Sequence, residues 1–220
     1  MRKRVKQSAH CTRPELRNKV HLKIDNADVD LSSVTSKSLY NAFKMAKQTP
    51  SSAQKRFQDQ FPDVQFDWNE IYSLSFKLSL ETKIREFQYK VLNNIVFTNE
   101  KLFKIKMIDS PQCTFCKNEI ESLEHLFYNC EITRSLWVAL RSWLMECNIN
   151  LEPLSFFNVL FSIFNAGEDF VTVNRLILVA KFYICHCKFN GVKPAVRFLK
   201  TKIGAILNIE SRIAFMRNKE

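Results

Sequence analysis

The strongest chemical signal in the sequence is a compact group of three cysteines and one histidine. Its members are Cys113, Cys116, His125 and Cys130. Zinc prefers four tetrahedral thiolate and imidazole ligands, and a Cys-x-x-Cys pair presents two thiolates from one tight turn. Because four protein ligands leave no open position on the metal, the spacing predicts one structural Zn²⁺ rather than a hydrolytic centre.

The cysteines admit two other interpretations. Cysteine is often simply buried in a core, and a Cys-x-x-Cys pair also occurs in redox proteins. The nearness of His125 and Cys130 in the sequence, together with the lack of a βαβ pattern, favours zinc over both. We expect Ser122 to cap a short helix that carries His125 and ends near Cys130.

Other candidate ligands are weaker. Cys185, His186 and Cys187 are adjacent within a predicted helix, where neighbouring side chains point about 100° apart and do not converge, so we expect core packing. The pair His10 and Cys11 is assigned no role. Four carboxylates near the zinc element are expected to be solvated: Asp109, Glu119, Glu121 and Glu124.

Positive charge, +11 overall, is concentrated at the two ends of the chain. Residues 1–24 carry +7 and residues 175–220 carry +8, whereas residues 112–174 carry −5. This pattern favours RNA or DNA as a partner, bound through phosphate contacts, although a solvated lysine-rich surface is the simpler alternative. Besides the basic lead-in, the candidate contacts on predicted helices are Lys83, Arg85, Lys90, Lys193, Arg197 and Lys200.

The composition excludes several classes of function. With three glycines among 220 residues, no glycine-rich phosphate loop and no G-x-S-x-G nucleophile motif can be drawn. No apolar segment follows the basic start, and the seven cysteines are an odd number, so reduced thiols and an intracellular location, nuclear or cytoplasmic, are expected. The longest apolar run, 176–187, contains Lys181, so no membrane partner is expected.

Hydrophobic spacing is helical along most of the chain and predicts an all-α fold, a helical bundle with a small inserted CCHC zinc knuckle. Helices are expected near 35–46, 54–61, from 68, 80–95, from 98, 131–147, 153–165, 168–189 and from 194. One apolar stripe comprises Ile84, Phe87, Val91 and Ile95. Trp137 and Trp143 lie six positions apart, on different sides of one helix, which leaves room for one of them to be exposed.

The chain divides into four predicted segments. Residues 1–34 are a basic flexible lead-in, and residues 35–111 are linker helices. Residues 112–147 hold the zinc-binding element and the helix that follows it, and residues 148–220 form the C-terminal helices.

The run from Lys83 to Trp137 resembles the zinc-binding region at the C-terminal end of non-LTR (LINE-type) retrotransposon reverse transcriptases. The matching features, in order, are FQYKVLNNIVFTNEKL, CTFC, EHLFYNC and a tryptophan seven residues later. Upstream, SKSLYNAF and FDWNEIY resemble linker helices, and the resemblance extends over about residues 35–200. It implies that the three cysteines and His125 are zinc ligands and that the region contacts RNA template or target nucleic acid.

The resemblance does not extend to catalysis. The family's polymerase needs an Asp-Asp motif, and no Asp-Asp pair occurs in this sequence. The chain is therefore expected to be a tail of such an element that is not an enzyme and that binds nucleic acid, with RNA preferred and a reverse transcriptase core as a further partner. The alternative is a zinc-organised protein-interaction module that docks a polymerase core or a host factor.

Overall fold

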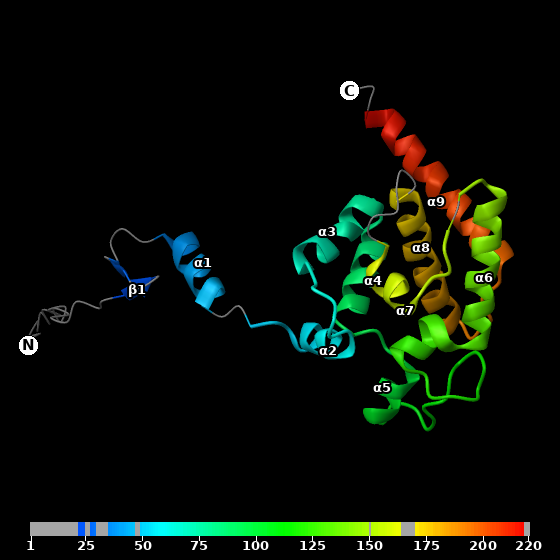
Figure 1. The fold of residues 1–220 in the computed structure, drawn as a ribbon, viewed down its shortest axis with the longest axis horizontal. Coiled ribbons are helices and arrows are strands. Elements are labelled where there is room, and N and C mark those ends of the chain that lie inside the picture. Colours follow the sequence, from blue (N-terminus) through cyan, green and yellow to red (C-terminus); the bar gives the residue numbers. More distant parts are fainter. Residues whose placement is uncertain are drawn as a thin grey trace, which may run out of the picture. The chain divides into compact units, whose positions relative to one another are not determined.

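The structure is a computed structural model that describes residues 22–24, 27–29, 35–46, 49–149, 151–163 and 170–217. The chain divides into two compact units, residues 1–49 and residues 50–220 (Figure 1). Most of the predicted lead-in, including His10 and Cys11, lies outside the described residues.

The first unit contains two short strands that were not predicted. β1 (Leu22–Ile24) pairs antiparallel with β2 (Ala27–Val29), and Leu22 lies opposite Val29. Three residues per strand are too few for an alternating pattern to be recognised. The helix α1 (Ser36–Ala46) begins where Thr35 predicted it, because the Thr35 hydroxyl accepts a hydrogen bond from the Ser38 amide at 3.1 Å.

The second unit is helical, and the predicted all-α bundle with an inserted CCHC element is confirmed. Its helices are α2 (Ser52–Gln60), α3 (Trp68–Leu78), α4 (Thr82–Leu92), α5 (Asn99–Lys104), the π-helical turn η1 (His125–Asn129), α6 (Glu131–Glu146), α7 (Phe156–Phe161), α8 (Phe170–Phe189) and α9 (Val196–Arg217).

The helix α8 is the centre of this unit. It packs against α3, α4, α7 and α9, and Figure 1 shows it in the middle of the group with the zinc element and α5 at one end. It is apolar on nearly every side, as a core helix must be. Contrary to the expectation from Lys181, its length and composition alone also fit a membrane span, but 67% of the apolar window is buried inside the structure.

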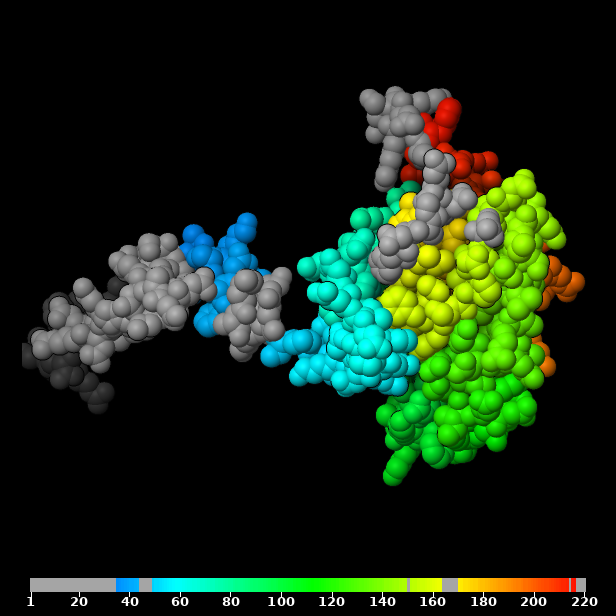
Figure 2. Space-filling model, in the orientation of Figure 1, coloured from blue at the N-terminus to red at the C-terminus, as the bar shows by residue number. Residues whose placement is uncertain are grey.

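Aromatic side chains join α2 to α7. Phe57 of α2 and Phe61, the C-cap residue after it, meet the Phe161 ring edge to face, at centroid distances of 5.1 and 6.1 Å. Phe66 stacks on Trp68 at 4.7 Å and also meets Phe161. Edge-to-face and offset pairs of this kind add to the free energy of simple burial. In the space-filling view, α7 (yellow) lies between α2 (cyan) and α6 (lime) (Figure 2).

Some helix boundaries differ from the predicted ones. The helix α4 ends at Leu92, and Asn94 takes the left-handed conformation with φ 52°. Ile95 therefore leaves the stripe and is 51% exposed. The helix α7 begins after Ser155, whose side chain and that of Asn158 form a capping box, rather than at Pro153.

Candidate metal centre

The four predicted zinc ligands come together in space. One ligand atom from each residue lies within 4.8 Å of the other three. The Sγ atoms of Cys113 and Cys130 are 3.8 Å apart, and Cys116 Sγ lies 3.3 Å from His125 Nε2. Tetrahedral zinc with Zn–S bonds of about 2.3 Å has an S···S edge of roughly 3.8 Å, so this donor set fits one zinc ion.

A short hairpin-like turn positions the first two cysteines. Gln112 and Ile120 form an antiparallel bridge, and the Cys113 amide donates to the Glu119 carbonyl at 2.7 Å. Lys117 turns the chain back with a left-handed φ of 63°. The Phe115 amide donates to Cys113 Sγ at 3.4 Å, a contact that orients the sulfur.

A π-helical turn positions the other two ligands. In an α-helix, residues five apart point about 140° away from each other. Here the Cys130 amide donates to the His125 carbonyl at 2.9 Å, an i to i+5 bond that widens the turn. His125 and Cys130 thereby reach the same centre. Ser122 begins the segment as predicted, because its hydroxyl accepts from the His125 amide at 3.0 Å.

The other histidine nitrogen faces a carboxylate. His125 is buried, and its Nδ1 lies 3.1 Å from Glu119 Oε2. The geometry does not meet the criteria of a hydrogen bond, so Nδ1 is without a hydrogen-bond partner among the described residues. Metal-bound histidines commonly present the second nitrogen to a carboxylate, which fixes the orientation of the ring. Glu119 is therefore not only a solvated charge, as the sequence suggested, but stands behind a metal ligand.

The thiols differ in acidity. Burial raises the pKa of Cys113 to about 12 and also raises that of Cys130. Burial works in the same direction at Cys116, but hydrogen bonds from the Asn118 and Glu119 amides and from His125 lower its pKa to about 7. A zinc ion would supply the positive charge that lets the two buried sulfurs exist as thiolates.

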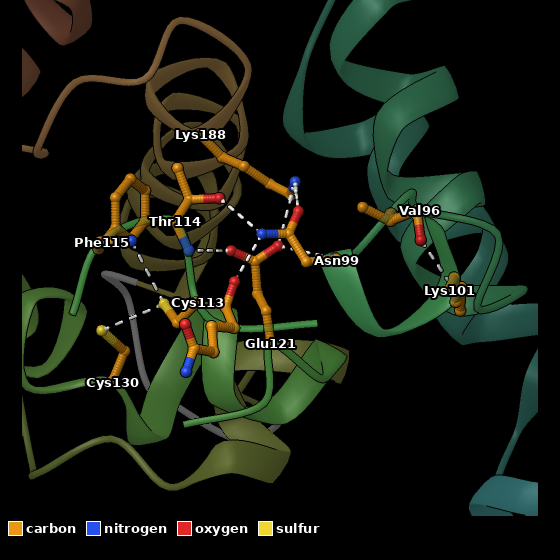
Figure 3. Close-up of polar contacts among 10 residues, drawn as sticks. Val96, Asn99, Lys101, Cys113, Thr114, Phe115, Glu121, Cys130 and Lys188 are labelled. Carbon is orange, nitrogen blue, oxygen red and sulfur yellow. Dashed lines mark hydrogen bonds and ion pairs between the residues drawn. The ribbon is translucent and has the colours of Figure 1, made fainter. Parts of the chain in front are cut away.

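Behind the ligands lies a buried ion pair that the sequence analysis missed. Glu121 is fully buried and its Oε1 lies 3.0 Å from Lys188 Nζ of α8 (Figure 3). The same carboxylate accepts from the amides of Thr114, at 2.7 Å, and Asn99, at 3.0 Å. The expectation that Glu121 is solvated is therefore wrong, because the zinc turn, α5 and α8 all contact its carboxylate.

This network joins the zinc element to the bundle. Lys188 also donates to Asn99 Oδ1 at 2.9 Å, while Asn99 Nδ2 donates to the Gln112 carbonyl at 2.7 Å, next to the first zinc ligand. Thr98 is the N-cap residue of α5, but its side chain makes no capping hydrogen bond. The Glu121 carboxylate instead accepts a hydrogen bond from the Asn99 amide at the start of that helix. The sequence alone does not indicate this arrangement, because only the tertiary fold brings Glu121 to the start of α5.

The remaining candidates take core or surface roles. Within the described residues, Cys185 and Cys187 are buried in α8, His186 is exposed, and none of them joins a metal cluster. Trp137 is buried and donates to the Phe127 carbonyl at 2.7 Å. Trp143 is half-buried, with Lys200 Nζ 5.0 Å from its ring centre.

The predicted nucleic-acid contacts are divided among several surfaces. Lys83 and Lys90 are exposed on one side of α4, whereas Arg85 turns to the other side, donates to the Ser79 carbonyl and covers the Phe76 ring. Lys193 precedes α9, so the prediction that it lies on a helix is wrong. Arg197 is exposed over Phe198, and Lys200 covers Trp143.

Comparison with known protein families agrees with this geometry. Residues 35–137 match the family described as zinc-binding in reverse transcriptase. The matched stretch runs from the start of α1 into α6 and includes all four ligands. No curated protein matches the chain. Residues 35–137 are therefore similar to the zinc-binding region of reverse transcriptases.

Proposed function

We propose that this chain is a non-catalytic nucleic-acid-binding domain, with RNA as its preferred ligand and one zinc ion in a structural role. The observation that carries the proposal is a set of six cations without acidic partners, of which Lys83, Lys90, Lys193 and Arg197 are exposed. Among the described residues, no carboxylate lies within 4.0 Å of Lys83, Lys90, Lys193, Arg197, Lys200 or Lys202. Cations left without partners on a protein of net charge +11 are suited to phosphates.

The metal centre supports a structural rather than a catalytic role. Four protein donors complete a tetrahedral zinc shell, and Cys113, Cys130 and His125 are buried. A centre of this kind holds the turn 112–121 and η1 together, and the Glu121–Lys188 pair transmits that order to α8. The zinc ion would then stabilise the fold that positions the lysine and arginine side chains for phosphates, rather than catalyse a reaction.

The wider setting follows the family. We place the chain as the tail of a LINE-type retrotransposon reverse transcriptase that acts in the nucleus or cytoplasm, next to a reverse transcriptase core and without a membrane partner. The match to the zinc-binding family supports this setting, and the absence of an Asp-Asp pair supports a tail without its own polymerase chemistry.

The test is a fluorescence-anisotropy titration of the zinc-loaded chain with single-stranded RNA, single-stranded DNA and duplex DNA at two salt concentrations. We expect binding to all three that weakens as salt rises, with RNA bound most tightly. Absence of salt-dependent binding would overturn the proposal and favour a protein-interaction module instead.

A further inference from the structure

A groove of about 600 Å³ lies between α4 and α8, away from the metal ligands. Its walls are mostly apolar and aromatic: Phe87, Ile95, Val96, Phe97, Phe182 and Phe189. Phe182 and Phe87 meet edge to face at 5.4 Å and form part of its apolar wall. The volume falls in the range of ordinary ligand sites in proteins.

Two phenylalanines in this groove are unusually exposed. Phe97 is 54% exposed and Phe189 is 60% exposed, and Ile95 beside them is 51% exposed. Phe97 lies in the segment between α4 and α5, and Phe189 is the last residue of α8. Exposed aromatic faces at the rim of a groove offer stacking surfaces for flat rings.

Cations border the same groove. Lys83 and Lys90 line it from α4, two helical turns and about 10 Å apart along the axis. Lys202 of α9 lies next to the lining residue Phe182, with its Nζ 5.0 Å from the centre of that ring. Glu86 is the acidic residue of the lining, and within the described chain it is not within ion-pair distance of any of these lysines.

We infer that this groove binds the unpaired bases of a single-stranded nucleic acid, with Phe97 and Phe189 stacking on bases and Lys83, Lys90 and Lys202 contacting phosphates. The inference rests on the proposed function and assigns the nucleic-acid binding to the groove between α4 and α8. Aromatic platforms beside a basic track are the arrangement by which proteins bind single strands with little sequence preference.

Charge complementarity decides between this occupant and a protein helix. An apolar helix would cover the phenylalanines but would leave the three lysines without partners unless it carried carboxylates on both flanks. A single strand can contact both the phenylalanines and the lysines along its whole length, because each nucleotide carries one flat base and one phosphate. Duplex nucleic acid would satisfy the lysines only, since its bases are already stacked.

The experiment compares three twelve-nucleotide single strands of matched charge, which are RNA, DNA and an abasic DNA strand, with a DNA duplex of the same length, which carries about twice that charge. The intact zinc-loaded chain should bind the single strands more tightly than the abasic strand. The variant Phe97→Ala/Phe189→Ala should lose about 5- to 150-fold in affinity for the single strands per stacked base, and should bind the abasic strand as the intact chain does.

Two control variants separate stacking from other effects. Phe103→Ala removes a phenylalanine of similar exposure, 45%, on α5 outside the groove, and should change no affinity. Lys83→Gln/Lys90→Gln should reduce the salt slope for single strands by up to about 1.4, whereas Lys55→Gln on α2 should not. Zinc content and melting temperature should match the intact chain, because all substituted side chains are exposed.

The two proposals fail in different ways. Salt-dependent binding that is the same for abasic and normal strands, or unaffected by Phe97→Ala/Phe189→Ala, would overturn the groove and leave nucleic-acid binding intact. No binding of any of the four ligands would overturn the proposed function itself.

Discussion

At the residue scale, Cys116 is the metal ligand whose substitution best separates loss of zinc from loss of packing. It is half-buried, so a serine there disturbs packing little but removes one thiolate from the shell. Structural zinc contributes ~10 kcal/mol or more to the folding of small sites. We expect Cys116→Ser to lower zinc content and to increase amide exchange over residues 110–135.

The matched control is Cys185→Ser, which changes a buried cysteine outside the cluster and should leave one zinc per chain. Metal analysis by mass spectrometry under native conditions measures both. Full zinc content in Cys116→Ser would remove Cys116 from the ligand set.

Lys181 is the second residue with a distinct signature. It is fully buried in α8, and its Nζ donates to Gln88 Oε1 at 2.7 Å and to the Leu160 carbonyl at 3.1 Å. Burial lowers its pKa from 10.5 to about 7. Because the unfolded chain then binds the proton more tightly than the folded chain, the free energy of unfolding should increase with pH above 7.

Between pH 7 and 8.5 the increase should be on the order of 2 kcal/mol, from about 1.4 kcal/mol per pH unit. Above pH 9 the buried Cys185, whose pKa burial raises to about 11, would oppose it. Lys181→Met should be at least as stable as the intact chain at pH 7 and should lose this pH dependence. Urea unfolding at both pH values measures it, and an identical rise in Lys181→Met would contradict the assignment.

At the scale of elements, the buried Glu121–Lys188 pair joins the zinc turn, α5 and α8. Removing one partner of a buried ion pair costs about 3–5 kcal/mol, since the other charge remains in the core. Glu121→Gln keeps the shape of the side chain and should lower the free energy of unfolding by that amount.

A double-mutant cycle tests the coupling. Glu121→Gln/Lys188→Met removes both charges, so its loss of stability should be smaller than the sum of the two single losses. Urea unfolding in the presence of zinc gives the four values. Additive losses would show that the two side chains act independently.

The same elements show what the sequence could predict. Helices with a polar cap and an apolar stripe were placed within a few residues, as at Asp67, which accepts from the Glu70 amide at the start of α3. The zinc ligands were also predicted, because their spacing is local. Glu121 and Lys188 were missed, because they lie 67 positions apart and neither charge carries a local pattern that announces burial.

The groove residues illustrate the same limit. Lys83 and Lys90 were predicted from one helix, but Lys202 of α9 comes near the groove only because it lies over the Phe182 ring, a contact that depends on how α8 and α9 pack. Arg85 and Lys193 were predicted as contacts from helical spacing alone. The first is turned to the other side of α4, and the second lies before α9 begins.

At the scale of the whole molecule, the proposed nucleic-acid binding depends on phosphate neutralisation by the cations of the folded unit. The variant Lys193→Gln/Arg197→Gln/Lys200→Gln removes three positive charges from the C-terminal end, two of them within α9. The core should survive, because Leu199 and Ile203, not these residues, are buried. A charge-matched control uses exposed lysines elsewhere in the unit: Lys55, Lys77 and Lys106.

The most direct measurement is the slope of log affinity for single-stranded RNA against log salt concentration, for the intact chain and for the two triple variants. Each phosphate contact on a single strand contributes roughly 0.7 to this slope. We expect a steep slope for the intact chain, a slope lower by up to about 2 for the Lys193, Arg197 and Lys200 variant, and a smaller change for the control. A slope near zero for the intact chain would contradict nucleic-acid binding through these cations.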